Sequence, residues 1–348
     1  MSDTPRIDAE DVRRQLSVRI LVIALLSQFV LFGGLIYFAV NGFPLPGGGK
    51  TKSHSSAART DGPTATTARP SPAIAAGPDT LPVATAHRFD GARAFRLTAR
   101  QVGYGQRPAG SPQLAKLAEL LRPLLPSGHF EALPGSTAAK PLRNIVGTLP
   151  GKQPAIVIGA HYDTLVKPVG FVGANNGAAG SAVVIEVARA MKKLKRPPGA
   201  RALTFVLFDG EEPDAGLPEE QTDFYDTGLR GSRAYTARHP HATQSMLLLD
   251  YVGNRNLTLP REASSDGTLW RQVRRAATQV GVASIFPDRV DVSIEDDHTP
   301  FQHQGVPAVD FIDWSYPGHT LQDGMKQISV KALDAVGETV VQHLINVG

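Results

Sequence analysis

The hydropathy pattern of this chain changes twice between its first and its last residue. Residues 20–40 are apolar on every side of a helix, carry no charge and are interrupted only by Ser27 and Gln28. At 1.5 Å per residue, a helix of about twenty residues matches the roughly 30 Å hydrocarbon core of a membrane. Because the apolar region of a cleaved signal peptide is shorter, about 7–15 residues, the pattern predicts a retained transmembrane anchor.

Basic residues before this run set its expected orientation. Arg13, Arg14 and Arg19 precede it directly. By the positive-inside rule, residues 1–19 form a cytoplasmic tail, and the chain is a single-pass membrane protein whose remaining part lies outside the cytoplasm. Residues 41–87 consist mainly of Gly, Pro, Ala, Ser and Thr. Such a segment buries too little apolar surface to offset the entropy of ordering, so we expect a flexible linker.

The third region, residues 88–348, alternates short apolar runs with segments of helical periodicity. Expected strands lie at 144–149, 155–159, 202–208, 246–252 and 308–312. Expected helices lie at 114–125, 178–194, 269–280 and 330–345. Apolar strands that alternate with helices predict one α/β domain, with a mainly parallel central sheet covered by helices on both faces.

Composition removes several classes of protein. The 348 residues are 42% hydrophobic and 20% charged, which excludes a wholly disordered chain and a polytopic membrane protein. A net charge of +4, from 36 basic and 32 acidic residues, is too small to favour a nucleic-acid partner. The chain has no cysteine, so disulfides, thiolate metal sites and cysteine nucleophiles are excluded.

Ionisable residues follow the expected strands at their carboxyl ends, where ligands bind in such sheets. In chain order they are His161, Asp163, Glu211, Glu212, Asp250, Asp313 and His319. Taken singly, each has a simpler interpretation as a solvated histidine, a surface carboxylate or a helix cap. Together at one sheet edge, the carboxylates are unfavourable unless a cation neutralises them. Imidazole and oxygen ligands without thiolates favour a hydrolytic zinc centre, with a neighbouring carboxylate as general base.

The segments around these residues read GAHYDT, VGANNGAAG, FDGEE, LLLDYVGN, DDHTPF with GVPAVDFID, and YPGHT. In this order they resemble the zinc-dependent aminopeptidase family that also contains the glutaminyl-peptide cyclotransferases, metallopeptidase family twenty-eight. The resemblance runs from GQRPAGSP near residue 105 to the C-terminus. It implies a mixed, largely parallel sheet flanked by helices, one or two zinc ions, and peptide or protein N-termini as substrates.

The resemblance also implies roles for single residues. His161 and Asp250 match the ligands of one zinc ion, and Glu212 and His319 match those of the other. Asn176 falls on the acidic residue that bridges both ions in the family. In the cyclotransferases, one zinc is bound at the positions that match Asn176, Glu212 and His319.

Three further carboxylates receive roles in the same way. Glu211 matches the general base, and Asp163 matches the carboxylate that orients the histidine ligand. Asp296 matches an acidic position that, in the cyclotransferases, belongs to the hydrogen-bond network around the substrate.

Asn176 is the departure from the family pattern with the largest consequence. An amide oxygen is a weaker ligand than a carboxylate and removes one negative charge, so we expect weaker zinc binding and a poorly occupied second site. Because Gly177 follows it, slow deamidation of Asn176 to Asp is a further hypothesis, which an intact mass would test.

Three functions are compatible with these residues. We expect a zinc aminopeptidase that hydrolyses N-terminal residues of extracellular peptides. The alternative is a glutaminyl-peptide cyclotransferase that forms N-terminal pyroglutamate, favoured by the acidic segment after Glu212 and by DDHTPF. Gly318, at a position where the cyclotransferases have tryptophan, argues against that alternative. The third is a catalytically weakened or silent binding domain, supported by Asn176.

Overall fold

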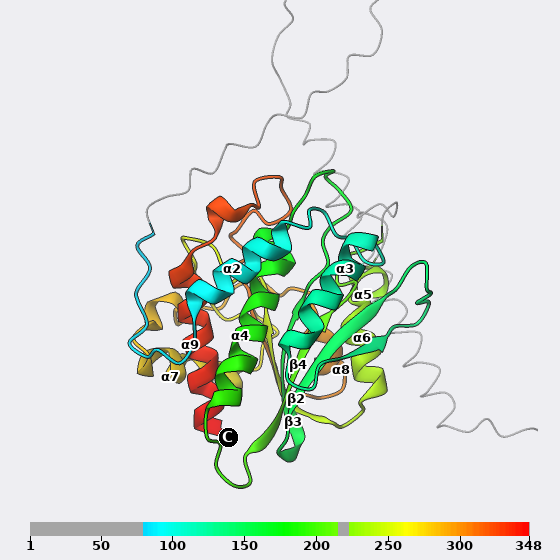
Figure 1. The fold of residues 1–348 in the computed structure, drawn as a ribbon. Helices are drawn as coiled ribbons and strands as arrows, with labels where there is room; N and C mark the ends of the chain where they lie inside the picture. Colours follow the sequence, from blue (N-terminus) through cyan, green and yellow to red (C-terminus); the bar gives the residue numbers. More distant parts are fainter. Residues whose placement is uncertain (1–78, 215–222, 348) are drawn as a thin grey trace, which may run out of the picture. The chain divides into compact units, whose positions relative to one another are not determined.

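A single mixed sheet forms the centre of the fold. We describe it from a computed structural model, which describes residues 79–214 and 223–347 (Figure 1). The strands are β1 (His129–Ala132), β2 (Arg143–Leu149), β3 (Lys152–His161), β4 (Arg201–Phe208), β5 (Thr243–Leu249) and β6 (Ala308–Phe311). Their order in the six-stranded sheet is β1-β2-β4-β3-β5-β6. The pairs β3–β4, β3–β5 and β5–β6 are parallel, whereas β1–β2 and β2–β4 are antiparallel.

Helices cover both faces of this sheet. The longer ones are α2 (Gly91–Val102), α3 (Pro112–Leu121), α4 (Gly180–Lys193), α7 (Gly267–Gln279) and α9 (Val330–Val347). All five contribute buried residues to the larger hydrophobic core, on one face. The opposite face carries α6 (Arg230–Arg238) and α8 (Thr299–His303), whose Tyr235 and Phe301 join the second core. Shorter segments are α5 (Phe224–Thr227), η1 (Arg122–Leu124), η2 (Ala174–Ala179), η4 (Ala283–Ile285) and η5 (Met325–Gln327).

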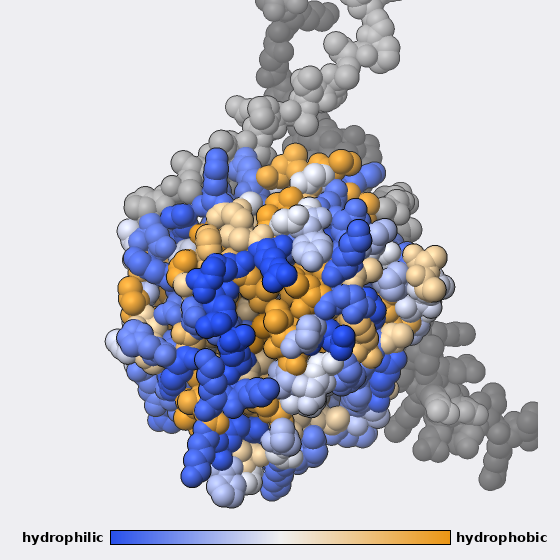
Figure 2. Space-filling model, viewed as in Figure 1, coloured by the Kyte–Doolittle hydropathy of each residue, from blue (hydrophilic) through white to orange (hydrophobic). Residues whose placement is uncertain are grey.

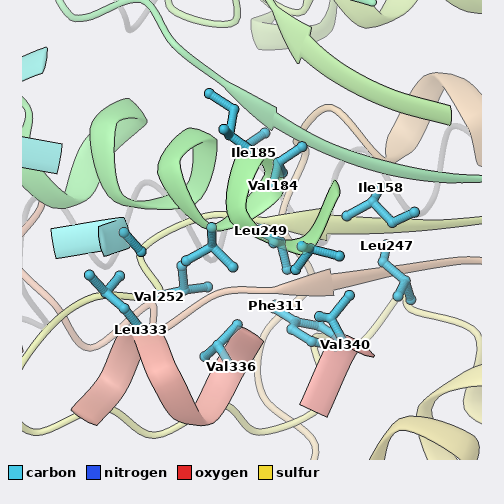
Figure 3. Packing of buried hydrophobic residues seen from close by; sticks show 14 of the residues in the cluster. Ile158, Val184, Ile185, Leu247, Leu249, Val252, Phe311, Leu333, Val336 and Val340 are labelled. Carbon is cyan, nitrogen blue, oxygen red and sulfur yellow. The ribbon is translucent and has the colours of Figure 1, made fainter. Parts of the chain in front are cut away.

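The two cores follow from the two-residue period of the strands. In β5, Leu247 and Leu249 pack into the larger core, whereas Met246 and Leu248 pack into the second. Figure 3 shows Leu247 and Leu249 beside side chains of α4 and α9. Since both faces of the central strands are covered, these strands appear in the sequence as continuous apolar runs rather than as alternating ones.

The outer surface of the helix layer is mostly hydrophilic. Figure 2 shows polar residues over much of the face that carries α2 and α4, with a smaller hydrophobic area near the middle of the view. The helices therefore bury one side against the sheet and present the other to solvent, as amphipathic helices do.

The expected α/β fold with a mixed, largely parallel sheet is confirmed, and β2 matches the strand expected at 144–149. The antiparallel edge strand β1 and the helices α2, α6 and α8 lie in segments for which no element was expected. The boundary at residue 88 is also too late, because Ala84 is buried in the larger core and the Thr85 N–H donates to the Val280 carbonyl. This part of the expected linker belongs to the folded unit.

The expected anchor cannot be compared with the structure, because residues 20–40 lie outside the described residues. Within residues 79–214 and 223–347, no helix combines the length and the hydropathy needed to cross a bilayer. The anchor, the tail at 1–19 and the linker up to residue 78 stay predictions from the sequence.

Candidate active site

Neighbouring parallel strands bring the candidate residues to one edge of the sheet. His161 ends β3, Asp250 directly follows β5, and Glu211 follows β4 by three residues. In the sheet, β3 lies between β4 and β5 and runs parallel to both. The carboxyl ends of the three strands therefore open at the same edge, and the loops that follow them meet there.

His161 lies at the centre of a group of carboxylates. Its Nδ1 is 3.5 Å from Asp163 Oδ1 and 3.6 Å from Glu211 Oε2, and its Nε2 is 3.5 Å from Asp250 Oδ1. The ring is buried, and neither nitrogen has a hydrogen-bond partner among the described residues. Burial alone would lower the pKa of His161, but the surrounding carboxylates, Glu211 first, outweigh it and raise the pKa well above its usual value.

Asp163 has a second structural role besides its approach to His161. Its carboxylate oxygens accept the backbone N–H groups of Glu211 and Glu212, each at 3.3 Å. The loop after β3 therefore fixes the position of the loop after β4. This contact between two loops was not expected from the sequence.

Asn176 and Glu212 form the second half of the site. The Asn176 Nδ2 donates to Glu212 Oε1 at 2.7 Å, and the same oxygen is 3.9 Å from the His319 Nε2. The segment η2 bends at Asn176, and Gly177 takes a φ of +95°. A side chain at residue 177 would place its Cβ 2.5 Å from the Asp163 carbonyl oxygen. Only glycine permits this close approach of the two loops.

Two residues for which no role was expected hold these loops. Asp323 accepts the backbone N–H groups of Asn175 and Asn176, at 2.8 and 2.9 Å, and the Tyr316 hydroxyl at 2.7 Å. Arg107 is completely buried and donates to the main-chain carbonyls of Tyr162 and Gly173, at the two ends of the connection between β3 and η2. Arg107 lies within GQRPAGSP, and an arginine beside Gly and Pro in that motif was the available signal.

The acidic residues of the site are strongly desolvated. Burial, together with Glu212, raises the pKa of Glu211 well above its usual value. Burial raises the pKa of Glu212 to about 8 and that of Asp296 to about 7. The Asp296 Oδ2 is buried and accepts no hydrogen bond from the part of the chain that the structure describes. Such a group of carboxylates can hold protons near neutral pH, which suits general acid–base chemistry.

These residues surround a cavity of about 450 Å³. Its polar lining includes Asn176, Glu211, Glu212, Asp250, Asp296 and His319. His319 comes from the loop after β6, and its side chain is 48% exposed, so it stands at the mouth. His161 and Asp163 lie beneath the lining, and Asp313 stays apart, because it accepts hydrogen bonds from Asn254 and Thr258.

The donor set fits zinc in its chemistry. The unpartnered Nε2 of His161 could bind a metal ion through its lone pair beside Asp250, while Nδ1 faces Asp163. Two ligand atoms on a tetrahedral zinc lie about 3.4 Å apart. The separations of 3.5 Å in the pair His161–Asp250 and 3.9 Å in the pair Glu212–His319 are near that value.

Asn176, which falls on the bridging position of the family, makes a hydrogen bond within the site. Its amide nitrogen, which cannot act as a ligand, faces Glu212. Within the described part of the chain, no three His, Asp or Glu side chains are already grouped to hold a metal ion. The site thus contains two ligand pairs rather than a preformed set of three.

Comparison with known proteins places this arrangement among related enzymes. The family model "Peptidase family M28" matches residues 144–344, more than half of the chain. A glutaminyl-peptide cyclotransferase of Bothrops jararaca is 27% identical over 244 residues, 59% of this chain and 66% of the relative. Aminopeptidase YwaD of Bacillus subtilis is 27% identical over 208 residues, 54% of this chain and 40% of the relative. The match thus spans less than two thirds of the length of these curated relatives.

Solved structures give the same two kinds of relative. A glutaminyl cyclase of Porphyromonas gingivalis superposes with a TM-score of 0.64 at 28% identity, covering 75% of this chain and 99% of that one. A Zn-dependent exopeptidase of Parabacteroides distasonis gives a TM-score of 0.63 at 25% identity, covering 74% of this chain and 98% of that one.

Proposed function

Because this chain belongs to Peptidase family M28, we propose that it is a zinc-dependent enzyme acting on peptide N-termini, and that it cyclises N-terminal glutamine. The observation that carries the choice of reaction is Asp296. Its buried carboxylate lines the cavity together with Glu211 and Asp250, and its charge adds to burial and to Glu212 in raising the pKa of Glu211. Because the matching acidic position in the cyclotransferases belongs to the hydrogen-bond network around the substrate, the place of Asp296 in the cavity beside Glu211 supports cyclisation.

Cyclisation moves one proton in two transfers, through Glu211, and consumes no water. The α-amine nitrogen attacks the side-chain amide carbon, a carbon–nitrogen bond forms, and the bond to the leaving nitrogen breaks. Glu211 accepts the proton of the amine and delivers it to that nitrogen, which leaves as ammonia. Asp250 and Asp296 line the same cavity as Glu211 and would face the substrate amine there. Glu212 and His319 would hold a zinc ion, which when bound polarises the amide carbonyl.

Aminopeptidase activity is the second candidate, supported by the separation of 3.5 Å between His161 Nε2 and Asp250 Oδ1. This pair could hold a second zinc ion, as in the dinuclear site implied by the family resemblance. In that reaction Glu211 would take a proton from water instead of from the substrate amine. The neutral amide of Asn176 weakens this alternative, since two dications would face fewer carboxylates.

One experiment distinguishes these functions. The full chain is loaded with zinc, its metal content is measured by elemental analysis, and peptides beginning with glutamine or leucine are supplied in parallel. Pyroglutamate without release of a free amino acid is the expected result. Free leucine or glutamine would instead establish hydrolysis. No turnover of either peptide, in the wild type and in Asn176→Asp, would leave only the silent binding domain.

Glu211→Gln tests the assigned base. We expect turnover to fall by at least about 100-fold, because the amide cannot accept the proton. Zinc content should not change, since Glu211 is not an assigned ligand. Glu212→Gln is the matched control and should lose zinc. Turnover of Glu211→Gln at the wild-type rate would refute its role as base.

A further inference from the structure

Gly318 and Tyr251 share one region of space beside the cavity. A methyl group added to Gly318 would lie 2.3 Å from Tyr251 Cζ and 2.4 Å from its hydroxyl oxygen. The ring of Tyr251 therefore occupies the volume into which a side chain at residue 318 would project. Because residues 251 and 318 are far apart in sequence, only the fold reveals that Tyr251 occupies the space of a side chain at residue 318.

The main chain of Tyr251 is held in an uncommon conformation. Its φ of +46° lies in the left-handed region, which is unfavourable for a residue with a bulky side chain. The Tyr251 N–H donates to the carboxylate of Asp250 at 2.8 Å, which fixes the turn after β5. The turn thus couples the direction of the ring to Asp250, a residue of the active site.

Aromatic neighbours surround the ring. Trp314 is stacked on it, with a centroid distance of 6.4 Å and an interplanar angle of 16°. Tyr316 contacts it at 5.7 Å, and His319 lies edge-on at 6.3 Å. Tyr251 is only 3% exposed and Trp314 is 49% exposed, so this pair runs from the interior of the cavity to its mouth.

The cavity lining combines carboxylates with the aromatic and apolar residues Tyr251, Trp314 and Ile294. The half-exposed ring of Trp314 presents apolar surface against which aliphatic carbons can pack, and the nearly buried ring of Tyr251, stacked with it, adds a small part of the lining. An N-terminal residue with an amine and an aliphatic stem suits this combination.

We propose that Tyr251 is a specificity-determining residue: with Trp314 it forms the wall against which the side chain of the substrate's first residue packs. This inference rests on the proposed action on peptide N-termini. It also corrects the expectation drawn from Gly318, because an aromatic wall reaches this place from the end of β5. Tyr251 together with Trp314, and not residue 318, then contacts the first side chain of the substrate.

Steady-state kinetics of the full chain test whether Tyr251 contacts the side chain of the substrate's first residue. In Tyr251→Ala, we expect KM for a glutaminyl peptide to rise by about 10-fold or more, with a smaller change in kcat, because a contact with the side chain is lost. Tyr251→Phe keeps the ring and should stay within about 3-fold of the wild type. Tyr104→Ala, a partly buried tyrosine outside the cavity, is the control. An unchanged KM in Tyr251→Ala would overturn the proposal.

Binding separates failure of the wall from failure of the proposed function. The half-exposed Trp314 is one of only two tryptophans, so its fluorescence can report a bound peptide. Glutaminyl and alanyl peptides are titrated against the wild type and Tyr251→Ala. If Tyr251→Ala binds the glutaminyl peptide more weakly than the wild type does, but binds the alanyl peptide equally well, the result supports the wall even when no peptide is turned over. Equal affinities in both proteins, or no binding to the wild type, would refute it.

The geometry has its own test, independent of any substrate. Gly318→Ala should lower the Tm of the wild type, because the added methyl meets the Tyr251 ring. In the Tyr251→Ala background the same change should have little effect, since the ring is gone. If Gly318→Ala lowers the Tm equally in both backgrounds, Tyr251 does not fill this space and the proposal fails.

Discussion

At the scale of single residues, Asn176 decides the charge of the site. Its amide donates to Glu212, so the site satisfies a buried carboxylate without a metal ion. A carboxylate at residue 176 would place two acids against each other, a conflict that a cation or a shared proton would relieve. We therefore expect the asparagine to lower the affinity for metal and to stabilise the site without it.

Asn176→Asp should reverse this balance. Without zinc we expect a lower Tm, because the introduced carboxylate would repel Glu212 and the hydrogen bond from the amide would be lost. With zinc the apparent affinity should rise by about tenfold, equivalent to about 1.4 kcal/mol. Thermal melts with zinc and with a chelator measure both effects.

Asn175→Asp provides the matched control for Asn176→Asp. It adds the same charge at a buried neighbour whose side chain contacts Gly253 and Asn254 instead of Glu212. Equal gains in zinc affinity in the two variants would mean that the position of the charge is unimportant, which would contradict our account of Asn176.

At the scale of elements, loops from separate strands are fastened by buried polar side chains. Arg107, in the segment between α2 and α3, donates to the loop after β3 through the Tyr162 carbonyl and to the segment before η2 through the Gly173 carbonyl. Asp323 accepts backbone N–H groups of η2. These contacts replace regular secondary structure, which ends before the site begins.

Arg107→Lys tests whether the hydrogen bonds of Arg107 to these main-chain carbonyls stabilise the fold. One ammonium group cannot reproduce the fork of the guanidinium, so buried carbonyls lose partners. We expect a loss of about 2–3 kcal/mol, or a Tm lower by roughly 5–10 °C. Arg100→Lys, exposed on α2, should leave the Tm unchanged. A wild-type Tm for Arg107→Lys would contradict the role of Arg107.

At the scale of the whole molecule, two cores on opposite faces of the sheet support one active edge. The larger core includes the buried apolar residues of α4, α7 and α9. Near its border His343 of α9 is buried, and neither ring nitrogen has a partner within residues 79–214 and 223–347. Burial lowers the pKa of His343 to about 4. Protonation of His343 in the folded protein therefore costs free energy because the side chain is buried, at a place outside the active-site cavity.

His343 should make stability depend on pH. The unfolded chain binds its proton near pH 6.5 and the folded chain near pH 4, so the stabilising effect is present above pH 6.5 and is lost as pH falls towards 4. The full difference is about 3 kcal/mol. Urea unfolding of the wild type and His343→Leu at pH 5 and 7.5 should show a smaller pH effect in the variant. His303→Leu, at an exposed site, should retain the wild-type pH effect.

Membrane attachment is a proposal at this scale, drawn from residues 20–40. Deleting residues 1–40 should move the protein from the membrane fraction to the soluble fraction, because the apolar segment is removed. Turnover should be unchanged, since the cavity is lined by residues 165–319. Wild-type protein found in the soluble fraction would contradict the anchor.

The sequence by itself determined the central strands and the long helices α3, α4, α7 and α9, and it indicated the chemistry expected at their edge. Continuous apolar runs fixed β3, β4 and β5, because strands buried on both faces cannot alternate, and the acids and histidines behind them indicated one sheet edge. Only the tertiary structure decided which atoms meet there. The amide direction of Asn176, the buried partners of Arg107 and the place of Tyr251 beside Gly318 arise from packing between distant segments. Such contacts leave no periodic signal along the chain, since they depend on three-dimensional distances alone.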